Sequence, residues 1–124
     1  MDKLIKEAQT IQDFLEITSS DDPAELSLRL SEINVYMARS GKMLADAKLL
    51  QDNAIASVYA QHFKAIQKMP ATVVIKFVNS QCAGANYLVN WLDRINRTCV
   101  HQGDNIRTQV SFAKEDMSLT RKGY

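Results

Sequence analysis

Two prolines, Pro23 and Pro70, each stand at the head of a run of about 45 residues that repeats apolar side chains at helical spacing. A proline suits the first turn of a helix and disfavours helical backbone in the residue before it. Because an α-helix rises about 1.5 Å per residue, each run would span roughly 65–70 Å. The sequence therefore predicts an all-α fold in which two long helices turn back at Pro70 as an antiparallel hairpin.

Local signals mark the ends of the expected helices. Asp22 precedes Pro23 and Glu25 follows, a combination typical of a helix N-terminus, because aspartate caps free N–H groups and glutamate can reach back to the cap. A short amphipathic segment lies in front of this start. We expect one helical domain over residues 1–124, with helices at about 2–18, 23–68 and 70–117 and a disordered tail at 118–124.

The run 72–78 is the one segment whose secondary structure is ambiguous. Its sequence, TVVIKFV, is rich in β-branched residues, which are common in strands. A strand needs a neighbour to satisfy its backbone hydrogen bonds, and the sequence holds no second strand-like run. A helix is therefore the favoured interpretation, and a strand at 72–78 is the alternative.

Each long run carries a seam of apolar residues spaced alternately four and three apart, as in helices that pack against one another. A second stripe through Tyr36, Met43 and Leu50 widens the apolar face of the first run, which favours a bundle. Two extended helices bury only one stripe each, so we expect a homo-oligomer. The packing residues that we predict are Leu26, Leu30, Ile33, Met37, Leu44, Leu88, Leu92, Ile95 and Ile106.

The formal net charge is only +1, but the charges are distributed unevenly along the chain. Residues 1–35 hold eight acids and three bases, and residues 36–124 hold six acids and twelve bases. An acidic head and a basic body can attract each other between subunits, or the body can meet an anionic ligand. The plain alternative is a set of scattered, solvated charges on long helices.

Composition also limits the location of the chain. No apolar run reaches the ~18 residues of a membrane span, so we expect no membrane partner. The start, MDKLIKEAQTIQDF, carries charges throughout and lacks the apolar segment of a signal peptide. Cys82 and Cys99 would lie about 25 Å apart on one helix, beyond disulfide reach. We therefore expect the chain to be located in the cytoplasm, which is a reducing compartment.

Catalytic and metal chemistry have little support in the sequence. The two histidines, His62 and His101, fall on different expected helices, and Cys99 lies two residues from His101, on another side of the same helix. No set of His, Cys and carboxylate residues has the spacing of a metal site. No nucleophile has a base and an orienting acid nearby in the sequence. We therefore expect no enzymatic activity, no metal and no cofactor.

The densest polar segment, residues 90–101, is the candidate site. Arg94, Arg97 and His101 are spaced i, i+3 and i+7, so they share one helix face. Guanidinium groups bind phosphates well, and aromatic rings can stack on bases. Alternatively, the arginines form salt bridges with Asp93, Asp104 or a neighbour's acidic head, and the aromatic rings pack between helices. The nucleic-acid contacts that we predict are Arg94, Arg97, His101 and Arg107, supported by Trp91 or Tyr87.

The chain resembles the small helical accessory proteins that phages and prophages encode near recombination genes, with the architecture of the T4-type recombination mediator. The resemblance implies an oligomeric, non-enzymatic protein that binds single-stranded DNA and loads a recombinase in the cytoplasm of a bacterial host. The likeness lies in the middle helix from Tyr36 through Tyr59, with the pattern Leu44, Ala47 and Leu50, and in the last helix, where Leu88, Ile95, Arg97 and Ile106 recur at similar intervals.

Two functions from different classes are consistent with these patterns. The first is a non-enzymatic, oligomeric accessory factor that binds single-stranded nucleic acid through its basic body. The second is a phage or prophage protein-interaction module, such as an inhibitor of a host enzyme or an assembly component, with residues 1–35 as its selective surface and no nucleic-acid role. A third, minor alternative is a sponge for an anionic nucleotide, enclosed by basic residues of several subunits.

Overall fold

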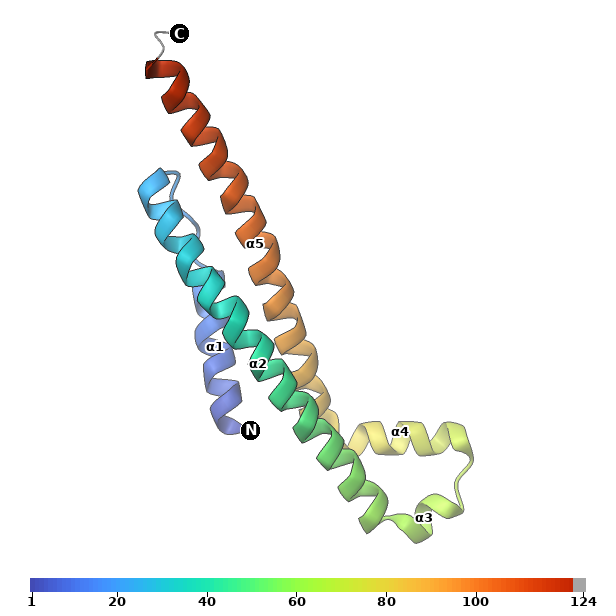
Figure 1. Cartoon of the computed structure of the whole chain (residues 1–124). Coiled ribbons are helices and arrows are strands. Elements are labelled where there is room, and N and C mark those ends of the chain that lie inside the picture. The colour runs from blue at the N-terminus through green and yellow to red at the C-terminus, as the bar shows by residue number, and fades with distance from the viewer. Residues whose placement is uncertain (122–124) are drawn as a thin grey trace.

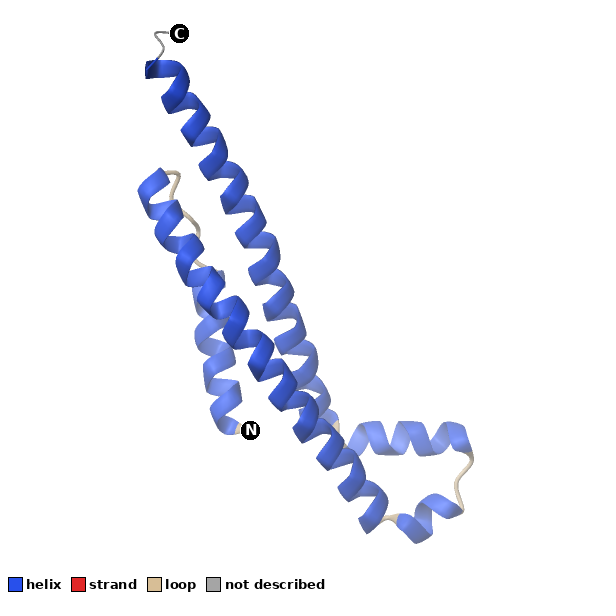
Figure 2. Cartoon of the chain, in the orientation of Figure 1, coloured by secondary structure: helices blue, strands red, loops and turns tan. Residues whose placement is uncertain are grey.

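The computed structural model describes residues 1–121, which form five helices joined by a linker at residues 16–22 and by shorter turns (Figure 1). Figure 2 shows that helix accounts for almost all of this described part, which contains no strand. The predicted all-α fold class is confirmed. The helices are α1 (Asp2–Leu15), α2 (Pro23–Gln61), α3 (Phe63–Gln67), α4 (Ala71–Gln81) and α5 (Ala83–Arg121).

The two long helices, α2 and α5, lie side by side and run in opposite directions, and α1 lies along both of them (Figure 1). Each helix turns its apolar stripe inward, because residues three or four apart share a helix face. From α1, for example, Ala8, Ile11 and Leu15 are buried. The continuous core between the three helices consists of Ala8, Ile11, Leu15, Leu26, Ile33, Met43, Ala47, Leu88, Leu92, Ile95, Cys99 and Ile106.

Polar side chains cross the interface between α2 and α5 near its middle and toward one end. The Asn96 amide donates hydrogen bonds to the Ser40 hydroxyl and to the Met37 carbonyl, both at 3.0 Å. The Gln51 amide donates to the Asn86 side-chain oxygen at 2.7 Å. Because a buried polar group is costly without a partner, these bonds favour one alignment of the two helices over its neighbours.

The start of α2 is formed as the sequence predicts, except that the Asp22 backbone N–H donates to the Ser20 hydroxyl at 3.1 Å and not to the Glu25 side chain. Pro23 is the first helical residue, and the Asp22 side chain accepts a hydrogen bond from the Glu25 backbone N–H at 3.4 Å. The end of α1 differs from the prediction, since the helix stops at Leu15 and not near residue 18. Side chains of α2 and α5 bind the last carbonyl groups of α1, which fixes its end at this point.

The predicted helices at 23–68 and 70–117 are wrong in their continuity, because each of these two segments is interrupted once. His62 separates α2 from α3 with φ −117° and ψ 22°, and Cys82 separates α4 from α5 with φ −106° and ψ 19°. The chain folds sideways here because Val58, Val78 and Cys82 form a small core of their own. The His62 ring also meets the Phe77 ring edge-on, with centroids 5.2 Å apart.

Two further predictions concern the ambiguous run and the tail. Residues 72–78 lie inside α4, so the helical interpretation is correct and the strand alternative is wrong. The predicted tail at 118–124 is wrong in its first part, because α5 continues to Arg121. Residues 122–124 lie outside the described residues. Across residues 1–121, no helix is long and apolar enough to cross a membrane.

An ion pair joins α1 to α2 at the surface. The Arg39 guanidinium donates two hydrogen bonds to the Glu7 carboxylate, at 2.7 and 2.8 Å. The hydrogen bond from Arg39 holds the pKa of the Glu7 carboxyl below its usual value. A lowered pKa in the folded state means that this pair stabilises the fold at neutral pH, and that its contribution is lost as the pH falls through the pKa of Glu7.

Candidate nucleic-acid interface on α5

The outward side of α5 carries a continuous polar face. Asn90, Arg94, Arg97 and His101 are all exposed and line a shallow depression together with Asp93 and Thr98. The core residues of α5 lie on the other side of the helix, against α1 and α2, so this face is free of intramolecular packing. We call Tyr87, Asn90, Arg94, Arg97 and His101 the α5 polar face.

The two arginines of the α5 polar face differ in their partners. The Arg97 Nε lies 3.2 Å from the Asp93 carboxylate, one helical turn away, and the Arg97 and Asp93 side chains are 73% and 42% exposed. Within the described residues, Arg94 has no ion-pair partner. An exposed pair of this kind is worth little free energy, so an incoming phosphate can compete with Asp93 for Arg97.

Arg107 lies apart from this face. Its guanidinium donates to the Asp104 carboxylate at 3.0 Å and to the Asn34 side-chain oxygen of α2 at 3.3 Å. The salt-bridge alternative therefore describes Arg107 and, in part, Arg97. The structure brings Arg94, Arg97 and His101 together and leaves Arg107 facing the α2 side.

The two aromatic side chains have different surroundings. The Trp91 indole N–H donates to the Gln12 side-chain oxygen of α1 at 3.1 Å, and the ring packs against the core. Tyr87 is 68% exposed, with its ring centroid 6.0 Å from that of Trp91. Trp91 thus has the packing role that the sequence left as an alternative. Tyr87 is the ring that is open to stack with a base.

The predicted packing residues lie between the helices of this one chain. Three of them, Leu30, Met37 and Leu44, are half-buried against the core, and the others are buried. The buried ones are Leu26, Ile33, Leu88, Leu92, Ile95 and Ile106. This seam is occupied within the chain, so an interface between copies has to use other residues.

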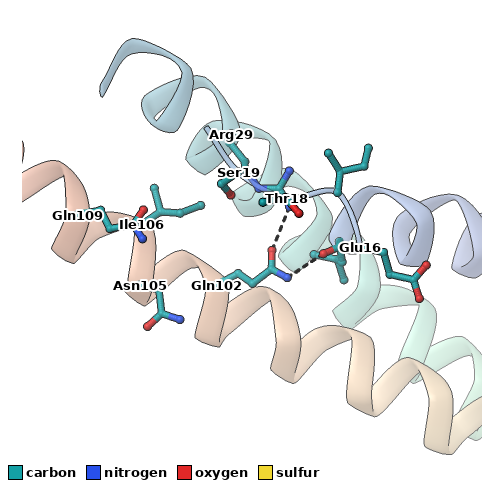
Figure 3. Close-up of a pocket in the computed structure, with 10 residues that line it drawn as sticks. Glu16, Thr18, Ser19, Arg29, Gln102, Asn105, Ile106 and Gln109 are labelled. Atoms are coloured by element: carbon teal, nitrogen blue, oxygen red, sulfur yellow. Dashed lines mark hydrogen bonds between the residues drawn. The ribbon is translucent and has the colours of Figure 1, made fainter. Parts of the chain in front are cut away.

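A second polar site lies where the linker after α1 meets α2 and α5 (Figure 3). Arg29 donates to the Phe14 carbonyl and to the Gln102 side-chain oxygen, each at 3.3 Å, and Gln102 donates to the Leu15 carbonyl at 3.0 Å. The guanidinium also stacks over the Phe14 ring at 4.6 Å. Because cations and donors stabilise the C-terminal end of a helix, these groups serve to hold α1 in place.

Sequence reasoning did not identify this role of Arg29 and Gln102. Both residues lie far from α1 in the sequence, and no local pattern shows which carbonyl groups they reach. The Nε atom of Arg29 is buried without a hydrogen-bond partner among the described residues, and the guanidinium is held by the Phe14 ring, the Phe14 carbonyl and the Gln102 side-chain oxygen.

Nucleophilic and metal-binding groups do not gather at either site. Cys82 and Cys99 are both buried free thiols. Burial raises the pKa of the Cys99 thiol, which lowers its thiolate fraction. In the part of the chain that the structure describes, no group of three His, Cys, Asp or Glu side chains could hold a metal ion.

Comparison of this chain with protein-family models, with curated proteins and with solved structures finds no match.

Proposed function

We propose that this chain is a non-enzymatic, oligomeric helical accessory protein that contacts single-stranded nucleic acid through the α5 polar face. The observation that carries the proposal is the free face itself, in which Arg94 has no acidic partner within the described residues and Arg97 has only an exposed one. Two guanidinium groups one turn apart can donate forked hydrogen bonds to neighbouring phosphates.

The polar neighbours suit the same ligand. Asn90 and His101 lie one turn beyond the arginines on either side and can donate to phosphate or sugar oxygens. Tyr87 lies one turn before Asn90 and offers an exposed ring to a base. The face extends about 21 Å along the helix, from Tyr87 to His101, so it fits a short single-stranded segment.

We expect Arg94→Ala combined with Arg97→Ala to lower oligonucleotide affinity about tenfold at 50 mM salt, because both charge-assisted phosphate contacts are lost. Fluorescence anisotropy of a labelled single-stranded oligonucleotide measures this. If wild-type binding uses two phosphate contacts, raising the salt concentration from about 50 to 200 mM should weaken it about sevenfold. Binding by the double variant should lose this dependence on salt.

The matched control is Lys64→Ala combined with Lys68→Ala, which removes the same charge from exposed positions at α3 and the turn after it. This control should bind as the wild type does. Equal losses in the two double variants would show that only net charge matters, and the absence of wild-type binding at 50 mM salt would refute the nucleic-acid proposal.

The second candidate function is a protein-interaction module with no nucleic-acid role. Exposed apolar side chains on α3 and α4 favour this candidate. Phe63 of α3 and Val73 and Ile75 of α4 are open to solvent and lie away from the core. This candidate predicts no salt-dependent oligonucleotide binding. The anisotropy titration of the wild type therefore separates the two functions.

A further inference from the structure

The outward side of α2 carries a second apolar stripe, which none of the other described helices covers. Its residues are spaced alternately four and three apart, as the buried seam is, and all of them are exposed. Leu28, Val35 and Leu49 are 67%, 66% and 61% exposed. We call this the outer stripe, which consists of Ala24, Leu28, Ser31, Val35, Ala38, Lys42, Ala45 and Leu49.

The outer stripe differs from the outward side of α5. A helix on the surface of a bundle normally turns charged and polar residues to solvent, and the α5 polar face follows this rule. The outer stripe holds one charged residue, Lys42, among eight. Its heptad spacing is that of a helix that packs against another helix. The contacts of α1 with α2, at Tyr36 and Arg39, leave it open.

We propose that the outer stripe packs against the outer stripe of a second copy of this chain, with the two α2 helices antiparallel. In one register each large residue meets a small one. Leu28 lies opposite Ala45 of the partner subunit, Val35 opposite Ala38 of the partner subunit, and Leu49 opposite Ala24 of the partner subunit. Pairs of large and small side chains let two helices approach closely without voids or overlap.

The charges beside the outer stripe fit the same register at its centre. On one flank, Glu32 lies next to Arg39 of the partner subunit, and the two-fold symmetry repeats this contact. At the ends of the same flank, Glu25 lies next to Asp46 of the partner subunit, and each Asp46 is already paired with Lys42 of its own chain at 2.7 Å. Arg39 already holds Glu7 of its own chain at 2.7 Å, so Glu32 would complete a three-residue network. A parallel, in-register pair would instead place Lys42 beside Lys42 of the partner subunit, which is repulsive.

This interface deepens the proposed function, since it names the surface that makes the protein oligomeric. The paired region from Ala24 to Leu49 is about 38 Å long. Each dimer would carry two α5 polar faces, so a single strand that reaches both would bind more tightly than either face alone allows. The interface does not depend on nucleic acid for its own stability.

Disulfide trapping tests the orientation and register. Leu28→Cys combined with Ala45→Cys should give a disulfide-linked dimer as the main product of mild oxidation, measured by non-reducing gel electrophoresis. Within one chain these positions lie about 25 Å apart along α2, so they cannot bond to each other. The native thiols are buried, and the wild type is the background control.

The single variants Leu28→Cys and Ala45→Cys provide the matched controls. Antiparallel pairing keeps identical positions about 25 Å apart, so neither single variant should form a disulfide-linked dimer. A linked dimer from Leu28→Cys alone would establish parallel pairing and overturn the proposal, and so would the absence of a linked dimer from the double variant. Trapping is done without oligonucleotide, so its outcome is independent of the test of the α5 polar face.

Discussion

Leu92→Ala should lower the free energy of unfolding by about 3 kcal/mol, because it leaves a cavity where the three helices meet. Leu92 is fully buried in the core that α1, α2 and α5 share. A loss of this size should lower the melting temperature by on the order of 10 °C, which circular dichroism at 222 nm measures. All samples need the same protein concentration, since self-association makes the melting temperature depend on it.

Leu28→Ala is the matched control for this change. It removes the same three carbon atoms from a leucine of the other long helix that is 67% exposed in the single chain. At a concentration low enough to keep the protein monomeric, it should change stability by less than about 0.5 kcal/mol. Similar losses at Leu92 and Leu28 would contradict the assignment of inner and outer sides to the two long helices.

Asn96→Ala should lower the free energy of unfolding by about 2 kcal/mol, because it removes two partly buried hydrogen bonds between α5 and α2. The Ser40 hydroxyl is fully buried and also donates to the Met37 carbonyl at 3.1 Å. That bond keeps the carbonyl satisfied and limits the loss. Urea denaturation monitored by circular dichroism gives the difference.

Ser40→Ala and the double variant complete a thermodynamic cycle. Ser40→Ala should cost less than Asn96→Ala, since the Asn96 amide keeps its bond to the Met37 carbonyl. The two losses should not be additive, because the residues share one network. Asn90→Ala, on the exposed side of the same helix, is the control and should leave stability unchanged. Additive losses would show that the Asn96–Ser40 bond contributes nothing.

Part of the fold could be predicted from local sequence signals. The start of α2 is determined by Asp22 and Pro23, whose effects act within one turn of the chain. The burial of Leu92 and Ile95 follows from apolar spacing, since one stripe of each helix has to face the core. These features depend on short-range chemistry and on periodicity, which a single sequence shows directly.

The breaks at His62 and Cys82 could not be predicted in this way. Apolar spacing continues through both residues, and neither is a proline or a glycine. The breaks depend on the small core at Val58, Val78 and Cys82, which brings together segments that are distant in the sequence. Tertiary packing of this kind can override local helix preference.

The candidate site was predictable only where it depends on spacing within one helix. The shared face of Arg94, Arg97 and His101 follows from helical spacing alone. The contacts of Arg107 with Asn34, and of Trp91 with Gln12, depend on which helices lie nearby. The residues of the outer stripe of α2 have heptad spacing, as do the buried residues of the same helix, such as Leu26 and Ile33. Only the structure shows which of these two sets is exposed.

The most direct test of the claim that this protein works as an assembly is its molar mass in solution. Light scattering on the wild type, at a concentration of about 50 μM, should give twice the 14.0 kDa of one chain, because the exposed apolar face of α2 needs a partner. A mass of 14.0 kDa under these conditions would contradict the account, since the outer stripe would then remain open to solvent in the native state.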